Sequence, residues 1–468
     1  DDCLGRRWCK IEHPGACGRV KLEALSLQHG NMFCSYLEKF QGAHAAGVPI
    51  PPWSQTGWSF LGSFIGIALL GLIQTYILNP EHFVLFVPAF GAMAVLLFSF
   101  IKAPPSQPYN TILGNGIGGF VGVLVFLALK AMGFSKVFWL SGALSVSLTI
   151  VMQEITGSQH PPGGATALIF AIVVDVQRQR FMYIAMPALL GAAVLVVVAT
   201  IMNNLSHARQ YPQWWSPIKP RQEADRKLQV EMHGTTEVEA QDSDDEESPI
   251  LLYFRKFAGA GAEAPAKPEL TETFFSFLGS FAGMSALGLF HTYFFMPTLH
   301  LPTEVAAFGA MSVLVFSLAK APLSQPMNAI LGNTIGGVVG WAIVELMKAL
   351  GWSQLLWLSG ALSVSVTIVV QERCNAVHPP GGATAMLFVV TTPLQKLGAK
   401  YIFAPAFLGT VIIVTVGLLT NNLSPKRTYP QRWWFNDDID AERKTWKELK
   451  TSEEKADADL LATLIKGA

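Results

Sequence analysis

The residues best suited to bind a small solute lie in an eight-residue element, HPPGGATA, which occupies positions 160–167 and recurs unchanged at 378–385. Its two prolines remove backbone donors and bias the preceding histidine out of helical geometry, so the element predicts a helix break followed by a new helix. The first turn of that helix would present amide hydrogens and the positive end of the helix dipole, which suit an anion. The glycines would let a ligand approach the backbone closely. The candidate substrate-binding residues are His160, Gly163, Gly164, Thr166, His378, Gly381, Gly382 and Thr384.

A structural interpretation of this element competes with the functional one. The prolines could simply end a helix, with the histidine satisfied by neighbouring groups. Unchanged repetition favours function, because the five residues before each histidine differ between the two positions, ITGSQ against RCNAV. A histidine could also add a hydrogen bond or a proton-linked charge. We therefore treat His160 and His378 as candidate ligands.

A second motif, KAPxSQPxN, also occurs twice and carries a lysine and an asparagine. Lys102 and Asn110 belong to the first occurrence, and Lys320 and Asn328 to the second. At a pore mouth these side chains would attract an anion, and we include them among the substrate-binding candidates. The structural alternative is a boundary lysine that extends its ammonium group to the lipid headgroups.

A third repeated motif, WLSGALSVSxTIVxQE, ends in an acid, Glu154 in its first occurrence and Glu372 in its second. Each acid lies close in sequence to an HPP histidine and is a candidate for a proton relay, whereas the alternative is a wetted charge at a helix end. Ser141, Ser145 and Thr149 recur every four residues and would form one polar stripe on a helix. Such a stripe either joins neighbouring helices or lines a path.

The elements that carry these motifs form a tandem repeat inside a membrane protein. The three motifs and the tetrapeptide NNLS all return after 218 residues. Only 14% of the residues are charged, against about 25% in a soluble domain, and 51% are hydrophobic. The charges are sparse within 53–205 and 271–424, which excludes an ordinary soluble enzyme. Lys+Arg and Asp+Glu number 33 each, so no excess charge indicates nucleic-acid binding.

Each repeat contains five apolar segments suited to cross a hydrocarbon core about 30 Å thick. The segments lie at 57–79, 82–101, 110–132, 137–153 and 182–202, and at 274–296, 303–319, 328–347, 355–371 and 401–420. The segment after each HPPGG is too short for an easy crossing and predicts a half-helix shielded by protein. The predicted fold is all-α and polytopic, with two homologous helical bundles, each of five full transmembrane helices and one short broken helix. Similar loop charges in the two copies favour parallel over inverted repeats.

The predicted domain organisation has five parts. They are a cysteine-containing tail at 1–52, the first transmembrane repeat at 53–216, a charged disordered linker at 217–270, the second repeat at 271–434 and a soluble helical tail at 435–468. The linker or the final tail could dock a soluble partner. The four cysteines of the first tail are irregularly spaced, so no zinc or disulfide module is expected.

The HPPGGATA element, preceded by WLSGALSVSLTIVMQE and by KAPxSQP, resembles the HPP family of integral membrane proteins. The resemblance covers 57–216 and 274–434. It implies a whole transmembrane domain in each repeat and a nitrite-like substrate, since members from cyanobacteria and plant plastids are associated with nitrite transport. It also implies the plastid envelope as a location. The tandem duplication departs from the single-copy pattern and could replace a homodimer.

The sequence thus favours a transporter or channel for a small, nitrite-like anion that uses its paired HPPGG breaks. The alternative is a membrane scaffold or sensor in which the HPP element is purely structural. The motifs HExxH, GxSxG and Walker A do not occur, so no enzyme activity, metal or cofactor is expected. The expected partners are the lipid bilayer and the anion.

Overall fold

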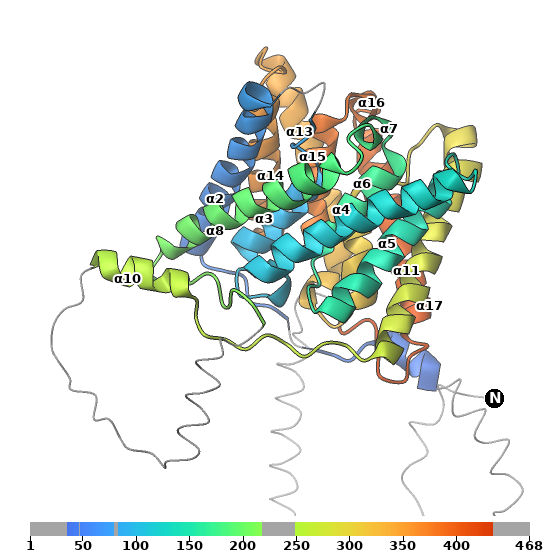
Figure 1. The fold of residues 1–468 in the computed structure, drawn as a ribbon, viewed down its shortest axis with the longest axis horizontal. Helices are drawn as coiled ribbons and strands as arrows, with labels where there is room; N and C mark the ends of the chain where they lie inside the picture. Colours follow the sequence, from blue (N-terminus) through green and yellow to red (C-terminus); the bar gives the residue numbers. More distant parts are fainter. Residues whose placement is uncertain (1–34, 46, 79–82, 218–248, 434–468) are drawn as a thin grey trace, which may run out of the picture.

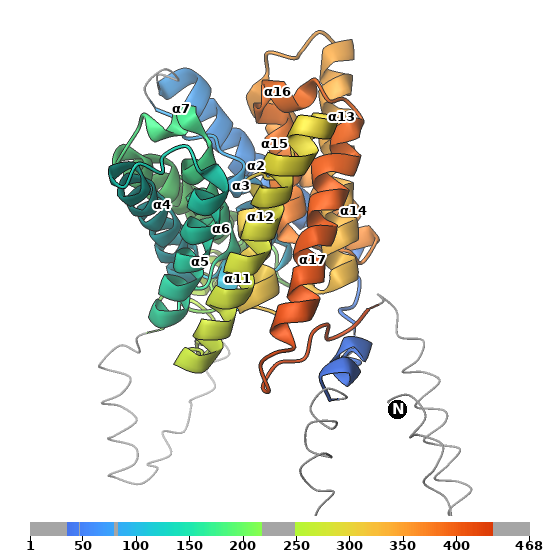
Figure 2. The same cartoon turned by 90° about the vertical axis from the view of Figure 1, so that its right-hand side faces the viewer.

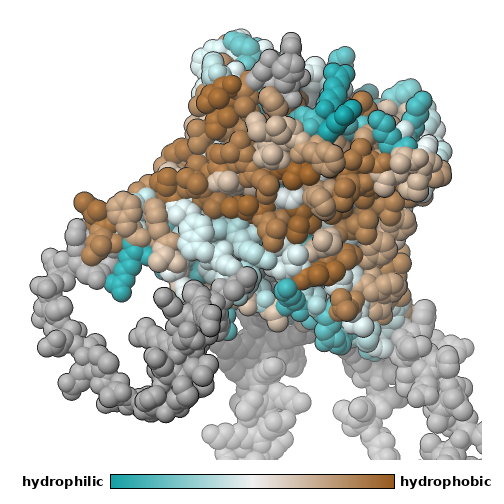
Figure 3. Space-filling model, viewed as in Figure 1, coloured by the Kyte–Doolittle hydropathy of each residue, from teal (hydrophilic) through white to brown (hydrophobic). Residues whose placement is uncertain are grey.

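The computed structural model describes residues 35–45, 47–78, 83–217 and 249–433, and the regular structure in these ranges is helical (Figure 1). Seven helices in the described part of the chain are long and apolar enough to cross a membrane. On the face shown in Figure 3, an apolar belt crosses the bundle and polar residues gather at its two ends. The protein is therefore a multi-pass membrane protein. The predictions for the N-terminal cysteines, the acidic part of the linker and the final tail fall outside the described residues.

The first repeat combines long helices with two short ones. Its helices are α2 (Trp53–Leu72, continued by η3, Ile73–Ile77), α3 (Ala89–Ser99), α4 (Pro108–Ala131), α5 (Phe138–Thr156), α6 (Pro161–Ile172), the single turn α7 (Val174–Gln177) and α8 (Ala192–Asn204, preceded by η5, Ile184–Gly191). At about 1.5 Å per residue, α4 is long enough to span the hydrocarbon core, whereas α3 and α6 are not.

The second repeat has the same order of helices, which confirms the predicted pair of homologous helical bundles. Its helices are α11 (Leu270–Phe290, continued by η7, His291–Leu299), α12 (Ala307–Ser312, continued by η8, Val313–Ser317), α13 (Pro326–Ala349), α14 (Leu356–Arg373), α15 (Pro379–Val390), the turn α16 (Thr392–Gln395) and α17 (Leu408–Asn421, preceded by η10, Ile402–Phe407).

The second apolar segment of each repeat is less helical than the sequence indicates. Within 82–101, residues 83–87 have no regular secondary structure and Pro88 begins the turn into α3, so only α3 is helical. Gln74 replaces the missing helical hydrogen bonds, because its side-chain oxygen accepts from two amides of this non-helical stretch. The Nδ1 atom of His291 accepts from two amides in the same way in the second repeat. Non-helical backbone persists in a membrane only where the protein satisfies it, and these two side chains do so.

The starts of α2 and α11 and the ends of α8 and α17 lie at one face of the bundle, which we call the terminal face (Figure 2). The turns α7 and α16 lie at the opposite face. The non-helical stretch with α3, and α6 with α7, complete two of the passes between these faces. Each repeat therefore begins and ends at the terminal face, and the two repeats are parallel.

The two repeats pack through exchanged pairs of helices: α2 against α14, α5 against α11, α3 against α15, and α6 against α12. Glycines lie where the short helices cross, since Gly91 faces the carbonyl of Gly382 and Gly164 faces that of Gly309. The centre of the molecule is therefore built from four short helices, two from each repeat.

Two segments at the terminal face, which we call straps, connect the repeats. The N-terminal strap (36–45 and 47–52) packs on the end of the second repeat, where Lys39 Nζ donates to the carbonyl of Ser424 at 2.7 Å. The linker strap (253–269) packs on the end of the first repeat, where Lys256 Nζ donates to the carbonyl of Ser206 at 2.8 Å. Each strap then leads into the first helix of the repeat on which it does not pack.

The linker strap differs from the disordered linker predicted over 217–270. Residues from 249 onward form α10 (Pro249–Arg255), the short turn η6 (Lys256–Ala258) and an extended stretch before α11. The two straps share a motif, Tyr-x2-Lys-Phe-x-Gly-Ala, at 36–43 and 253–260. This pair shows that the repeat extends further toward the N-terminus than the apolar segments indicate.

Candidate functional site

The two HPP elements form the predicted helix breaks. His160 is extended, with φ −146° and ψ 103°, and α6 begins at the next residue. Its Nδ1 lies 2.7 Å from the carbonyl oxygen of Pro105, and because a carbonyl only accepts, this nitrogen donates. His378 is arranged identically, with its Nδ1 2.7 Å from the carbonyl oxygen of Leu323. Both rings are fully buried, and their Nε2 atoms have no hydrogen-bond partner among the described residues.

The start of α6 is packed against backbone on two sides. A Cβ built on Gly163 would lie 2.3 Å from the carbonyl oxygen of Gly114, and one on Gly164 would lie 2.3 Å from that of Gly309. The equivalent contacts in the second repeat are Gly381 with Gly332, and Gly382 with Gly91. The glycines thus allow α4, α6 and α12 to meet closely. The prolines carry no amide hydrogen, and the amide of Gly163 donates to the carbonyl of His160 at 2.9 Å, so few donors remain for an anion.

The remaining polar candidates in and around the HPP element hold neighbouring segments. Thr166 donates to Asn115 Oδ1 at 2.7 Å, and Thr384 donates to Asn333 Oδ1 at 2.8 Å. The side-chain amide of Asn110 donates to two carbonyls of the loop before His160. Asn328 makes the same two contacts in the second repeat. The sequence motifs therefore come together as a buried joint.

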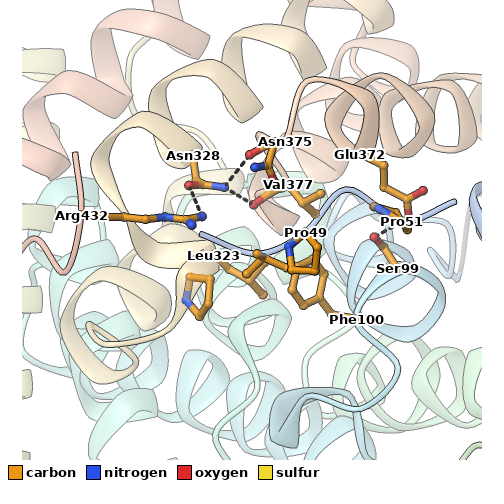
Figure 4. Close-up of a pocket in the computed structure, with 12 residues that line it drawn as sticks. Pro49, Pro51, Ser99, Phe100, Leu323, Asn328, Glu372, Asn375, Val377 and Arg432 are labelled. Atoms are coloured by element: carbon orange, nitrogen blue, oxygen red, sulfur yellow. Dashed lines mark hydrogen bonds between the residues drawn. The ribbon is translucent and has the colours of Figure 1, made fainter. Parts of the chain in front are cut away.

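A different set of residues lines two adjoining cavities at the terminal face, of about 160 Å³ and about 440 Å³, which we together call the vestibule. Both cavities are lined by Ser99 from the first repeat and by Glu372 from the second. Arg432 lines the smaller cavity, whereas Lys102 and Arg209 line the larger one (Figure 4 shows the smaller cavity). Three cationic side chains therefore share the vestibule with one carboxylate.

Glu372 links the two repeats inside the vestibule. Its carboxylate is at the end of α14, and the residue is only 1% exposed. Oε1 accepts a hydrogen bond from Ser99 Oγ, at the end of α3, at 2.6 Å. Oε2 has no hydrogen-bond partner among the described residues. One carboxylate oxygen is therefore available to a proton or a hydrated solute.

Arg209 supplies a buried positive charge that no carboxylate in the described ranges contacts. It follows α8, is 5% exposed, and donates to neutral oxygens alone. These oxygens belong to the side chains of Gln55, Ser59 and Asn203 and to the carbonyls of Gln55 and Phe98. Burial lowers the pKa of the Arg209 guanidinium to about 10, and the charge of Glu372 acts in the opposite direction. The guanidinium is thus protonated at neutral pH.

The vestibule contains three residues singled out from the sequence: Lys102, Asn328 and Glu372. Lys320 occupies the position that corresponds to Lys102, and both lysines are exposed, but Lys320 does not line either cavity. Glu154, which corresponds to Glu372, is 1% exposed, and neither of its oxygens has a partner in the part of the chain that the structure describes.

Sequence reasoning did not identify Ser99, Arg209 or Arg432. A signal for the arginine was present, because NNLSHAR at 203–209 and NNLSPKR at 421–427 place an arginine at the same position of two charge-poor repeats. Within the described ranges, no group of three histidine, cysteine or acidic side chains could hold a metal ion.

Comparison with known proteins gives one family and two relatives. The family described as HPP, transmembrane region, matches residues 48–212 and 265–430, well over half of the chain. A transmembrane protein of Dictyostelium discoideum is 37% identical over 167 residues, which are 36% of this chain and 58% of the relative. A second transmembrane protein of that organism is 36% identical over 183 residues, 39% of this chain and 58% of the relative. The chain thus spans less than two-thirds of the length of these relatives. No solved structure matches.

Proposed function

The chain belongs to the HPP transmembrane family, and from this premise we propose that it transports a small monovalent anion, nitrite or an ion of similar size. One observation carries the proposal: Lys102, Arg209 and Arg432 share a vestibule with a single carboxylate, at the junction of the two repeats. A cleft lined mainly by one sign of charge concentrates counter-ions and speeds their association. An anion at the terminal face is therefore attracted to the junction before it meets the apolar core.

Buried polar atoms support a route from the terminal face into the bundle. Ser363 on α14 is fully buried, and its hydroxyl has no hydrogen-bond partner among the described residues. Glu372 lies near the end of the same helix, and its Oε2 is likewise without a partner in the described ranges. Hydroxyls that only joined helices would donate across the helix contact. These positions are therefore better suited to a hydrated path.

In this proposal the HPP element keeps the route in shape, and the vestibule binds the anion. Gln153 secures the break, since its side-chain amide donates to the carbonyls of Gly114 and His160 at 2.9 and 3.0 Å. Breaks of this kind at a repeat interface are also the arrangement of many secondary transporters. Glu372 is the residue that would take up a coupled proton, because one of its oxygens has no partner in the described part of the chain.

Nitrite uptake into proteoliposomes that contain the purified full chain tests the proposal. Replacement of two vestibule cations by Lys102→Ala and Arg432→Ala should lower the initial rate about tenfold, because Arg209 and Glu372 then cancel. Lys396→Ala with Lys400→Ala is the matched control. It removes two charges beside α16 at the opposite face, outside the vestibule, and should change the rate by less than about twofold, since salt screens charges that are distant from the anion. Wild-type uptake no faster than in empty liposomes would contradict the proposal.

The compartment and the partners are further proposals. The resemblance to plastid members makes the plastid envelope the membrane to examine first, by imaging a fluorescent fusion of the full-length protein. The proposed partners are the bilayer and the anion, and a soluble protein could dock on the linker or on the final tail. Anion passage requires no catalytic residue, metal or cofactor.

A further inference from the structure

Two equivalent arginines at the terminal face have different partners. Arg209 Nε donates to the neutral side chain of Gln55 at 2.7 Å. Arg427, 218 positions later, donates from Nε to the carboxylate of Glu272 at 2.6 Å and forms an ion pair. Gln55 and Glu272 occupy the same position near the start of α2 and of α11. Arg427 is therefore in direct contact with a carboxylate, whereas no carboxylate in the described ranges contacts Arg209.

A second difference lies in the loops that follow α8 and α17. Arg432 Nη2 donates to Asn328 Oδ1 at 3.4 Å and lines the smaller cavity together with Glu372 (Figure 4). The equivalent residue of the first repeat is Trp214, which carries no charge. This position therefore carries a cation in the cavity that Glu372 also lines, whereas the corresponding position of the first repeat carries a neutral indole.

The two differences change the charge balance in the same direction. The vestibule holds Lys102, Arg209 and Arg432 against the single carboxylate of Glu372. The equivalent positions hold Lys320, Lys426 and Arg427 against Glu154, Glu269 and Glu272, and Lys267 Nζ donates to the carbonyl of Ile155, beside Glu154, at 3.0 Å. Two of these cations are ion-paired with Glu269 and Glu272, so the vestibule has the larger net positive charge.

We propose that this duplicated chain has one anion-binding site rather than two. A small monovalent anion binds in the vestibule that Glu372 lines. The equivalent position near Glu154 binds no anion, because Glu272 neutralises the charge of Arg427 there. This inference rests on the proposed function and assigns the entry of the anion to one end of the repeat interface. The smaller cavity, of about 160 Å³, has room for an ion of three or four atoms with a few waters of about 30 Å³ each.

Each repeat supplies the substitution that tests the other. Gln55→Glu gives Arg209 the partner that Arg427 has, and Arg432→Trp introduces the residue of the first repeat. Glu272→Gln is the matched control, because it places the glutamine of the first repeat beside Arg427. Nitrite binding to the purified full chain is measured by titration calorimetry in detergent, and nitrite uptake is measured in proteoliposomes. Thermal unfolding in the same detergent checks that each variant is folded.

We expect wild type to bind one nitrite per chain. Gln55→Glu with Arg432→Trp should weaken binding and slow uptake at least about tenfold, because the net positive charge is lost. Gln55→Glu alone changes one hydrogen-bond partner and should give a loss of about threefold with unchanged thermal unfolding. Glu272→Gln should lower neither binding nor uptake.

Two nitrite ions per wild-type chain, no nitrite binding, or equal losses from Gln55→Glu and Glu272→Gln would overturn the single-site inference. If uptake persisted in those cases, the transport proposal would remain and only the single-site inference would be lost. One bound nitrite per chain without uptake above empty liposomes would instead overturn the transport proposal and leave the binding site in place.

Discussion

The HPP joint and the vestibule differ in how similar the two repeats are at each place. The joint is identical in both repeats, fully buried, and packed so that Gly163 and Gly381 touch the backbone of a neighbouring helix. The vestibule opens at the terminal face, and there the repeats differ at Gln55 against Glu272 and at Trp214 against Arg432. Backbone contacts within a few ångströms tolerate no added atom, whereas residues around a cavity can change. Identity between the repeats therefore marks a constraint of packing, and divergence marks where one repeat has specialised.

The largest expected effect tests the packing side of this comparison. In Gly163→Ala the added Cβ would lie 2.3 Å from the Gly114 carbonyl oxygen and 2.4 Å from Gln153 Nε2. Neither the α4 backbone nor this bonded amide can withdraw easily, so the variant should lose about 3 kcal/mol or more of unfolding free energy. Thermal and denaturant unfolding of the full chain in detergent measures the loss.

Gly57→Ala is the control for that substitution. Gly57 lies in α2, and nothing is within 4 Å of a Cβ built on it. Alanine is favoured over glycine in a helix, so this variant should be as stable as wild type or slightly more so. Equal destabilisation by both substitutions would remove the packing explanation.

A smaller effect separates stability from transport at the same joint. His160→Ala removes the Nδ1–H hydrogen bond to the carbonyl of Pro105 and should cost about 2 kcal/mol of unfolding free energy. Uptake per folded molecule should stay within about twofold of wild type, because the ring is outside the residues that line the vestibule and few amides near it are free. A stable His160→Ala protein with abolished uptake would return the anion site to the HPP element.

The smallest effect concerns salt. A rise in ionic strength from about 0.01 M to about 0.15 M, made with an impermeant salt, shortens the screening length from about 30 Å to about 8 Å. Nitrite uptake should fall severalfold in wild type and in His160→Ala, and by less in Lys102→Ala with Arg432→Ala, which has lost the attracting charge. The same salt dependence in all three proteins would show that the vestibule charge does not guide the anion.

The fold could be predicted as far as local composition determines it. The offset of 218 residues gave the two bundles, and the paired prolines gave the breaks at His160 and His378. The non-helical stretch at 83–87 could not be found in this way. Its residues are as apolar as those of a crossing helix, and its hydrogen-bond partner, Gln74, belongs to a different helix. Apolar composition reports burial in the membrane and leaves the backbone conformation undetermined.

Part of the candidate site could likewise be predicted from local composition. Lys102, Asn328 and Glu372 stand out as polar residues in apolar surroundings, and all three line the vestibule. Arg209 had a signal in the repeated NNLSxxR pattern, but Arg432 had none, because a tryptophan holds its place in the first repeat. Its role depends on the cavity between repeats, and only the folded arrangement reveals which residues from the two repeats face the same space.

The straps make the two halves of this molecule mutually dependent. The residues before α2 fasten to the far end of the second bundle through Lys39, and those before α11 fasten to the far end of the first through Lys256. The end of each repeat is covered by the strap that leads into the other repeat. In a chain with a single repeat, the strap would have no other repeat to pack on unless a second chain supplied one. The tandem repeat supplies both surfaces within one chain, so each strap packs on the other repeat of the same molecule.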